Sequence, residues 1–250
     1  MPRLFAHLAY DGSKFDGFAP QPRPIPTVMA SLEQAFGKLG IFAPITAAGR
    51  TDKGVHATKQ VISLAIDPHW LGRFDYLAAK VNDTLHPQGA HIFNLRLVKE
   101  DFHPRFWAKQ RTYRYILSDK KPSIFAYPYI TYLPSLDHDA IIQSIPLFEG
   151  RHNFEYFAKQ DDQTQHAWRT IHKATAYQYH DLLVCQFTAD AYLRNQIRRM
   201  VGFLIAISDQ KVTPQMLMAQ RDGKALFFSK PAPPNGLYLS HIAYDQEIFL

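Results

Sequence analysis

Cysteine and long apolar runs are scarce in this sequence. Its 250 residues contain one cysteine, Cys185, which excludes an intrachain disulfide and any Cys-x-x-Cys pair for structural zinc or redox chemistry. No stretch approaches the roughly 18 consecutive apolar residues of a membrane span, and the N-terminus alternates apolar and polar residues instead of forming a signal peptide. We therefore expect a cytoplasmic protein that is neither secreted nor embedded in a membrane.

The motifs of common cofactors and of serine hydrolases are also missing. Gly12 and Gly17 have the separation of a phosphate-binding loop, but Phe18 and Ala19 stand where Lys and Ser or Thr are required. The chain has no G-x-G-x-x-G after a strand, no G-x-S-x-G elbow and no H-E-x-x-H pair. The sequence therefore predicts neither a metal nor a nucleotide cofactor.

Basic residues outnumber acidic residues, with 28 Lys and Arg against 22 Asp and Glu. The formal net charge is +6 at pH 7 with 12 further histidines, and the sequence pI is about 9.3. This balance suits a polyanionic partner, although many ordinary basic enzymes share it. An apolar content of 46% excludes a disordered chain, and at about 150 residues per domain the length allows one large domain or two small ones.

Hydrophobic periodicity predicts two α+β halves instead of a wound parallel sheet. The expected halves are residues 1–104, carrying a polar loop with an aspartate, and 105–250, carrying a tyrosine strand and an arginine helix. Strands are expected at 4–11, 61–66, 90–98, 106–117, 168–179, 182–189 and 237–244, and helices at 27–40, 77–85, 136–148 and 193–204 and from 213 onward.

Chemistry first concentrates in the loop from Gly49 to Ala57. Asp52 lies between Arg50 and Lys53, and loops held by strands often carry catalytic groups. An aspartate beside an arginine stays ionised at neutral pH and can act as a nucleophile. The alternative is a solvated turn, for which Asp and Gly are the usual residues.

The strand after Lys109 alternates in a second informative way. Arg111, Tyr113 and Tyr115 share one face, and aromatic rings interleaved with cations are typical of surfaces that bind single-stranded nucleic acid. A solubilising edge strand with half-buried tyrosines would show the same pattern.

A third candidate is the basic start of the helix at 193–204. Arg194 and Arg198 lie at the flank of its apolar stripe, so a half-buried Arg198 would need a carboxylate partner, and Asp52 is the attractive one. The alternative is an arginine whose aliphatic stem covers the edge of the core.

The loop Gly49-Arg-Thr-Asp-Lys-Gly-Val-His-Ala57 resembles the signature of the TruA family of tRNA pseudouridine synthases. The resemblance extends almost end to end, in order, through five further segments: Tyr10-Asp-Gly-Ser with Gly17 and Gln21, Phe102-His-Pro-Arg-Phe with Arg111-Thr-Tyr-Arg-Tyr115, Phe148 to Phe154, Tyr192 to Gly202, and Ala232-Pro-Pro-Asn-Gly-Leu237.

The resemblance implies site roles. Asp52 would be the catalytic aspartate and Arg198 its partner, while Tyr113 would pack on the base, Leu237 would lie under the uracil and Arg50 would stabilise the flipped-out nucleotide. It also implies a pseudouridine synthase fold, in which antiparallel sheets of two sandwich-like halves join across a central catalytic cleft. Further implications are a cofactor-free homodimer and tRNA as substrate, with modification at positions 38, 39 and 40 of the anticodon stem-loop.

Several points stay open at the level of sequence. The family usually has Trp and Gln where Phe18 and Ala19 stand, Ala in place of Lys53, and a small residue in place of Pro104, which leaves loop packing and RNA contacts uncertain. Asp52 could act at C1′, C6 or C2′. A non-catalytic RNA-binding module is the main alternative function, and a phosphate-ester hydrolase using Asp52 is a weaker one.

Overall fold

The computed structural model describes residues 1–23, 25–159 and 166–250, which form two compact units. The first unit comprises Met1–Lys109 and Tyr238–Leu250, and the second comprises Gln110–Leu237. This division differs from the expected halves, because the end of the chain returns to the first unit. There Tyr238 and Leu239 pair with the strand His56–Ala65, and the Lys99 amide donates to the Ile248 carbonyl over 3.0 Å.

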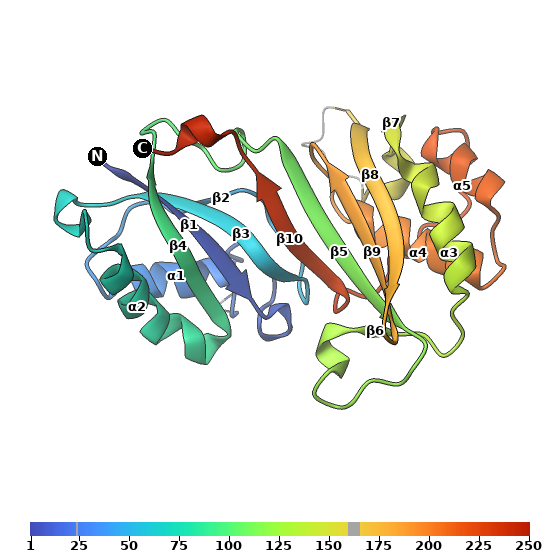
Figure 1. The fold of residues 1–250 in the computed structure, drawn as a ribbon, viewed down its shortest axis with the longest axis horizontal. Coiled ribbons are helices and arrows are strands. Elements are labelled where there is room, and N and C mark those ends of the chain that lie inside the picture. The colour runs from blue at the N-terminus through green and yellow to red at the C-terminus, as the bar shows by residue number, and fades with distance from the viewer. Residues whose placement is uncertain (24, 160–165) are drawn as a thin grey trace. The chain divides into compact units, whose positions relative to one another are not determined.

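The sheet of the first unit contains β4 (Ala90–Val98), β1 (Arg3–Tyr10) and β3 (His56–Ala65) in that order. Both neighbouring pairs are antiparallel. The short β2 (Thr46–Ala47) joins β3 antiparallel, and β10 (Leu237–Ala243) joins it parallel. In Figure 1, α1 (Val28–Gly37) lies behind these strands, and α2 (Phe74–Leu85) packs on β4.

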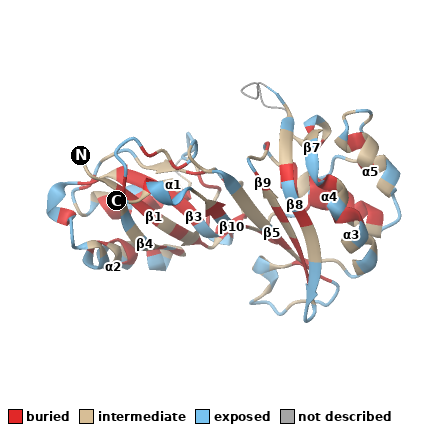
Figure 2. Cartoon of the chain, turned by 45° about the horizontal axis from the view of Figure 1, so that its top comes forward, coloured by how far each residue is buried: buried red, intermediate tan, exposed pale blue. Residues whose placement is uncertain are grey.

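Local signals account for the helices of this unit. The Thr27 hydroxyl accepts a hydrogen bond from the Ala30 amide and caps α1. Leu32 and Phe36 from α1 and Val81 from α2 are fully buried, and they belong to the core between helices and sheet that is coloured red in Figure 2. The amphipathic pattern read from the sequence thus decides which helix faces point inward.

In the described part of the second unit, neighbouring strands of the sheet run antiparallel. Its order is β5 (Gln110–Ser118), β9 (Leu182–Ala189), β8 (Trp168–Tyr179) and β7 (Gly150–Asn153), while β6 (Thr131–Tyr132) pairs parallel with β5. The α-helices among the described residues of this unit are α3 (His138–Ser144), α4 (Gln196–Ser208) and α5 (Pro214–Arg221). Because α3 packs on α4 and on β8, the helices and the sheet share one core.

The expected α+β class is confirmed, and most expected elements occur with small changes at their ends. The hairpin strands at 168–179 and 182–189 have the expected bounds. The helix expected over 136–148 is shorter, because Pro146 lacks the amide hydrogen that an α-helix needs and Ile145–Phe148 form a 3-10 helix. Within the described residues, no helix is long and apolar enough to cross a membrane.

Candidate active site

The loop that carries Asp52 connects β2 to β3 and is held from both sides. The Thr51 carbonyl accepts a hydrogen bond from the Phe18 amide over 3.1 Å, and the Thr51 hydroxyl lies 2.7 Å from the buried hydroxyl of Tyr10. The Gln60 side-chain amide donates to the Gly49 carbonyl over 2.9 Å. These bonds fix the backbone on either side of Arg50, so the loop is anchored to the first unit although Arg50 and Lys53 are exposed.

Two glycines near the N-terminus let the chain approach this loop closely. A methyl group at Gly12 would lie 2.2 Å from the Val55 carbonyl oxygen, closer than atoms can pack. Gly17 has a φ of +103°, and a methyl group there would lie 3.3 Å from the Thr51 carbonyl oxygen. The spacing of these glycines, which resembled a phosphate-binding loop, therefore serves contact with the Asp52 loop.

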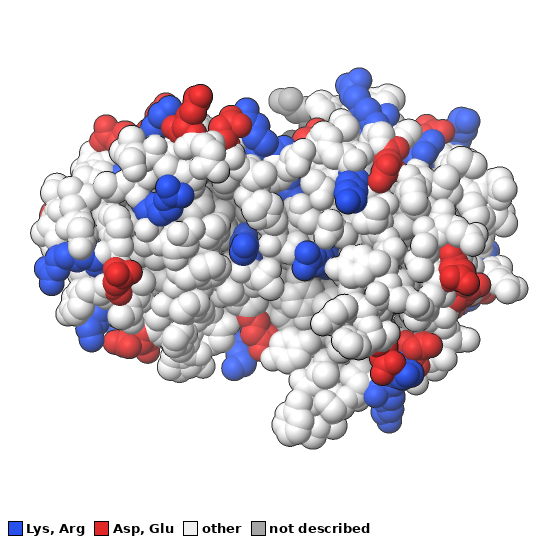
Figure 3. Space-filling model, viewed as in Figure 1, with Lys and Arg blue, Asp and Glu red and all other residues white. Residues whose placement is uncertain are grey.

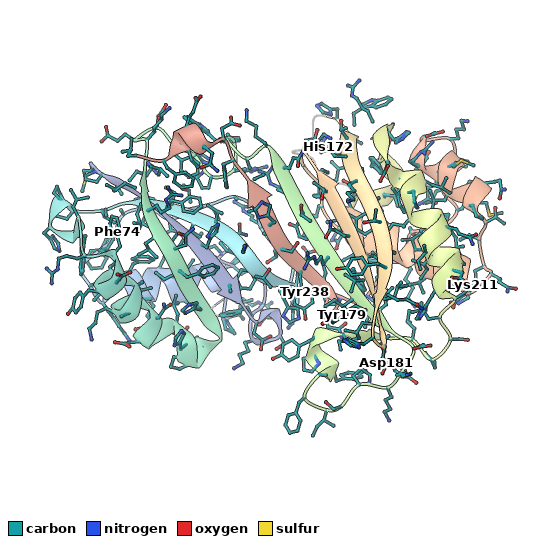
Figure 4. All side chains as sticks on the ribbon, viewed as in Figure 1. Phe74, His172, Tyr179, Asp181, Lys211 and Tyr238 are labelled. Carbon is teal, nitrogen blue, oxygen red and sulfur yellow. The ribbon has the colours of Figure 1, made fainter. Side chains whose placement is uncertain are left out.

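His56 anchors the end of the same loop. Its ring is buried and accepts a hydrogen bond at Nδ1 from the Gly12 amide over 3.0 Å. The ring also stacks on Tyr238, labelled in Figure 4, with centroids 4.7 Å apart and planes 18° apart. His56 lies in the loop motif but has no role predicted from the sequence; its contacts indicate a structural role.

The charged residues of the loop differ in their surroundings. Asp52 is half-buried, whereas Arg50 and Lys53 are exposed. The Val55 amide donates to the Asp52 carbonyl over 3.2 Å, which closes the turn that contains Gly54 at a φ of +78°. The Lys53 ammonium forms an ion pair with Asp16. Of the two cations beside Asp52, Arg50 is therefore the one with no ion pair among the described residues.

In the second unit, the two tyrosines of β5 have different surroundings. Tyr115 is fully buried, and its hydroxyl lies 2.7 Å from both the Thr131 hydroxyl and the Pro233 carbonyl. Tyr113 is half-buried, and its ring meets Tyr192 edge to face at 5.3 Å. The stacking surface expected from both residues thus reduces to Tyr113, because Tyr115 belongs to the core.

Tyr192 is a neighbour of Tyr113 for which the sequence predicted no role. Its hydroxyl is buried and has no hydrogen-bond partner among the described residues. Burial, followed by proximity to Tyr113 and Asp190, raises the pKa of this hydroxyl well above its usual value. Tyr192 therefore remains neutral and contributes chiefly its ring to the surroundings of Tyr113.

Arg198 lies on the first turn of α4 and is half-buried, as expected. Its Nε donates to the Ala232 carbonyl over 2.8 Å, and its Nη1 donates to the Asn195 side chain over 3.1 Å. A methyl group at Gly202 would lie 2.2 Å from the Lys230 carbonyl oxygen. The segment that leads to Leu237 is therefore pressed against the face of α4 that carries Arg198.

The same segment is also tied to β5. The Ile116 amide donates to the Gly236 carbonyl over 2.9 Å, and the Asn235 side chain donates to the Ile130 carbonyl over 2.8 Å. Leu237, the next residue, is 5% exposed. The segment before Leu237 therefore contacts both β5, which carries Tyr113, and α4, which carries Arg198.

No group of three His, Cys, Asp or Glu side chains with metal-binding geometry occurs in the parts of the chain that the structure describes. The candidate residues fall on both units: Asp52 and Arg50 belong to the first, and Arg198, Tyr113 and Leu237 belong to the second.

Residues 145–245 match a family model described as tRNA pseudouridine synthase. This match and the α+β fold identify the class of protein as a pseudouridine synthase. Three proteins called tRNA pseudouridine synthase A are similar over nearly their whole length. The one from Helicobacter hepaticus is 38% identical, covering 98% of this chain and 100% of the relative. The one from Wolinella succinogenes is 34% identical, covering 100% of this chain and 97% of the relative. One from Campylobacter jejuni is 37% identical, covering 98% of this chain and 100% of the relative. The chain belongs to the tRNA pseudouridine synthase A family.

Proposed function

We propose that this protein is an isomerase that converts uridine to pseudouridine in tRNA. The observation that carries the proposal is the similarity over the whole chain to tRNA pseudouridine synthase A proteins. The hydrogen bonds that hold the Asp52 loop against the first unit support it, because catalysis requires a carboxylate in a fixed position.

The reaction needs no outside atoms. The C1′–N1 bond of uridine breaks, the uracil turns over, and a C1′–C5 bond forms; N1 gains a proton and C5 gives one up. A carboxylate that acts on the nucleoside and a base that accepts the C5 proton are sufficient for these steps. We assign the carboxylate to Asp52.

We assign the other candidates to binding and orientation. Arg198 would hold the Asp52 carboxylate by a charge-assisted contact, and Tyr113 would stack on the uracil. Leu237 would pack beneath the same base. Arg50, which is exposed in the Asp52 loop, would contact the phosphate of the extruded nucleotide.

The finer expectations belong to the same proposal. We infer that the protein works in the cytoplasm as a homodimer and modifies positions 38, 39 and 40 of the anticodon stem-loop. The net charge of +6 supports binding of a polyanion of this kind. Light scattering would measure the oligomeric state, and primer extension after carbodiimide treatment of tRNA would map the modified positions.

Tritium release tests the reaction itself. With tRNA labelled by tritium at C5 of uridine, the wild-type protein should release tritium to water as pseudouridine forms. Asp52→Asn should release none at the same protein concentration. A wild-type protein that binds tRNA but releases no tritium would overturn the assignment and favour the non-catalytic RNA-binding alternative.

A further inference from the structure

The Asn235 side chain ties the segment that leads to Leu237 to the loop before β6. Its Nδ2 donates to the Tyr127 carbonyl over 3.0 Å and to the Ile130 carbonyl over 2.8 Å. Because a carbonyl oxygen can only accept hydrogen bonds, these two contacts fix which end of the amide carries the nitrogen. The amide oxygen lies 3.2 Å from the Thr131 hydroxyl. Asn235 therefore uses both ends of its amide within the second unit.

Two buried hydroxyls extend this contact into the core. Thr131 and Tyr115 are 2% and 0% exposed, and their hydroxyls lie 2.7 Å apart. The Tyr115 hydroxyl also lies 2.7 Å from the carbonyl of Pro233, two residues before Asn235. Buried polar groups joined in this way favour one arrangement, because separating them would leave polar atoms unpaired away from water. We call Tyr115, Thr131 and Asn235 the amide–hydroxyl network.

Gly236 lets the same segment lie directly against the network. A methyl group at Gly236 would be 2.7 Å from the Ile116 carbonyl oxygen and 2.8 Å from the Thr131 hydroxyl oxygen, closer than atoms can pack. The Ile116 amide donates to the Gly236 carbonyl over 2.9 Å, and the Leu237 amide donates to the Pro234 carbonyl over 3.0 Å. The backbone at Leu237 is therefore held by the turn before it and by β5.

Arg198 and Tyr113 are connected to this network as well. The Ala232 amide donates to the Arg198 carbonyl over 2.8 Å, and Arg198 Nε donates back to the Ala232 carbonyl. Burial raises the pKa of the Tyr115 hydroxyl above its usual value, and the nearby charge of Arg198 opposes that rise. Tyr113 lies two residues before Tyr115 on β5. A change in the network therefore acts on Leu237, Arg198 and Tyr113 together.

The loop that Asn235 contacts has no charged side chains of its own to hold it. Residues 122–136 contain neither acidic nor basic residues. The loop before β6 lies at the bottom of Figure 1, and the same part of Figure 3 is a mostly uncharged projection. Its tip carries Ile124 and Phe125, each 81% exposed. The hydrogen bonds of Asn235 therefore anchor the base of the loop, and the tip offers control positions that are not part of the network.

We propose that Asn235 is a positioning residue for the reaction, which acts with Thr131 and Tyr115 to hold Leu237 beneath the uracil. The proposal rests on the proposed function for the reaction and for the place of Leu237. Asn235 would not touch the reacting atoms. Its loss should leave tRNA bound, because phosphate contacts dominate affinity for nucleic acid. It should slow the chemical step, because a misplacement of about 1 Å can cost about a hundredfold in rate.

Asn235→Asp tests this role with almost no change in shape. The carboxylate lacks the two amide protons and directs a negative oxygen at the Tyr127 and Ile130 carbonyls. In tritium release, kcat should fall by about tenfold to a hundredfold. KM, and the Kd for tRNA from fluorescence anisotropy, should stay within about twofold of wild type, as expected when only the chemical step is affected. Urea unfolding gives the folded fraction under the assay conditions.

Thr131 supplies a matched pair of variants. Thr131→Val keeps the shape of the side chain without its hydroxyl and should lower kcat in the same way, whereas Thr131→Ser keeps the hydroxyl and should retain most of kcat. Ile124→Ala, at the exposed tip of the same loop, should leave kcat and KM unchanged. Asn235→Asp should cost much less in a Leu237→Ala protein than in wild type, because the side chain that it positions is then absent.

Amide hydrogen exchange follows the positioning without the reaction. In Asn235→Asp, the Ile116 amide, which donates to the Gly236 carbonyl, should exchange about tenfold faster, the change expected when one supporting hydrogen bond is lost. The Ile66 amide, which donates to the Pro2 carbonyl over 2.9 Å in the first unit, serves as the reference and should exchange at the wild-type rate.

The outcomes keep this proposal apart from the proposed function. If wild type releases tritium and both Asn235→Asp and Thr131→Val keep its kcat, the positioning role is wrong and the proposed function stands. Losses that only follow the folded fraction, or that are equal in Thr131→Val and Thr131→Ser, would also overturn the role and indicate a contribution to stability alone. If wild type released no tritium while exchange at Ile116 rose in Asn235→Asp, the proposed function would be wrong, and Asn235 would still fix the segment before Leu237.

Discussion

The two residues on which the assigned chemistry depends belong to different units: Asp52 to the first and Arg198 to the second. Asp52→Asn should reduce pseudouridine yield below detection and leave tRNA affinity unchanged or higher, because a negative charge is removed from a surface that binds phosphates. Asp16→Asn is the matched control, since that carboxylate pairs with Lys53 beside the same loop, and it should remain active.

Variants of Arg198 test its proposed pairing with Asp52. Arg198→Ala should abolish most turnover, and Arg198→Lys should restore part of it, because an ammonium does not reproduce the planar two-donor geometry of a guanidinium. If the two residues act as a pair, the second substitution in the Asp52→Asn, Arg198→Ala double variant should cost much less than it does in wild type. Additive losses in log kcat/KM would contradict the pair.

The ring and the hydroxyl of Tyr192 should have separable effects. Tyr192→Phe keeps the edge-to-face contact with Tyr113 and removes a buried hydroxyl that lacks a partner among the described residues. We expect wild-type turnover and no loss in the free energy of unfolding. Tyr192→Leu removes the ring contact, worth about 0.5–1.5 kcal/mol, and should lower kcat/KM by displacing Tyr113. Urea unfolding and tritium release measure the two quantities; an inactive Tyr192→Phe would mean that the hydroxyl acts in the site.

At the scale of elements, the Gly12 turn, which follows β1, packs closely against the Asp52 loop. Gly12→Ala would place a methyl group 2.2 Å from a backbone oxygen that belongs to that loop. We expect a loss of about 1–3 kcal/mol in the free energy of unfolding, typical of overpacking, and a larger loss of turnover because the Asp52 backbone must shift. Urea unfolding and tritium release should therefore change together.

Gly37→Ala is the control for this substitution. Gly37 ends α1, and a methyl group there meets only the side chain of the exposed Phe42 at 3.4 Å. Alanine is the better helix former, so stability should hold or rise and turnover should not change. A Gly12→Ala protein as stable and active as Gly37→Ala would show that the two loops can move apart without consequence.

For the whole molecule, histidines on the first unit predict sensitivity to acid. Burial, with Lys59 and His241 nearby, lowers the pKa of His7 to about 4. The unfolded chain would bind this proton near the ordinary value of about 6.5, so the unfolded state holds more protons between pH 6.5 and 4. The free energy of unfolding should therefore fall as the pH falls through that window and be unaffected by His7 above it.

Urea unfolding between pH 7.5 and 4 would measure this dependence. His7→Gln should flatten the curve, and the difference between variant and wild type should be constant above pH 7. Burial also lowers the pKa of His91 and His241, so some dependence on pH should remain in the variant. Parallel curves for the two proteins throughout the range would contradict the assignment to His7.

Local patterns in the chain were enough to predict the α+β class, nearly all helices and strands, and the loop that carries Asp52. These features depend on residues close together in the chain. Alternating burial follows from the sequence in a strand such as β1, Thr27 caps α1, and the Gly49–Ala57 motif is contiguous.

Which of these residues meet depends on packing between segments that are far apart in the chain. Tyr113 and Tyr115 have the same spacing pattern, but the hydroxyl partners Thr131 and Pro233 make Tyr115 part of the core. The assignment of β10 to the first unit and the alignment of His7 with Phe93 likewise depend on pairing between distant segments. Register of this kind is set by the packing of whole faces and by the closure of long loops, which local sequence patterns do not contain.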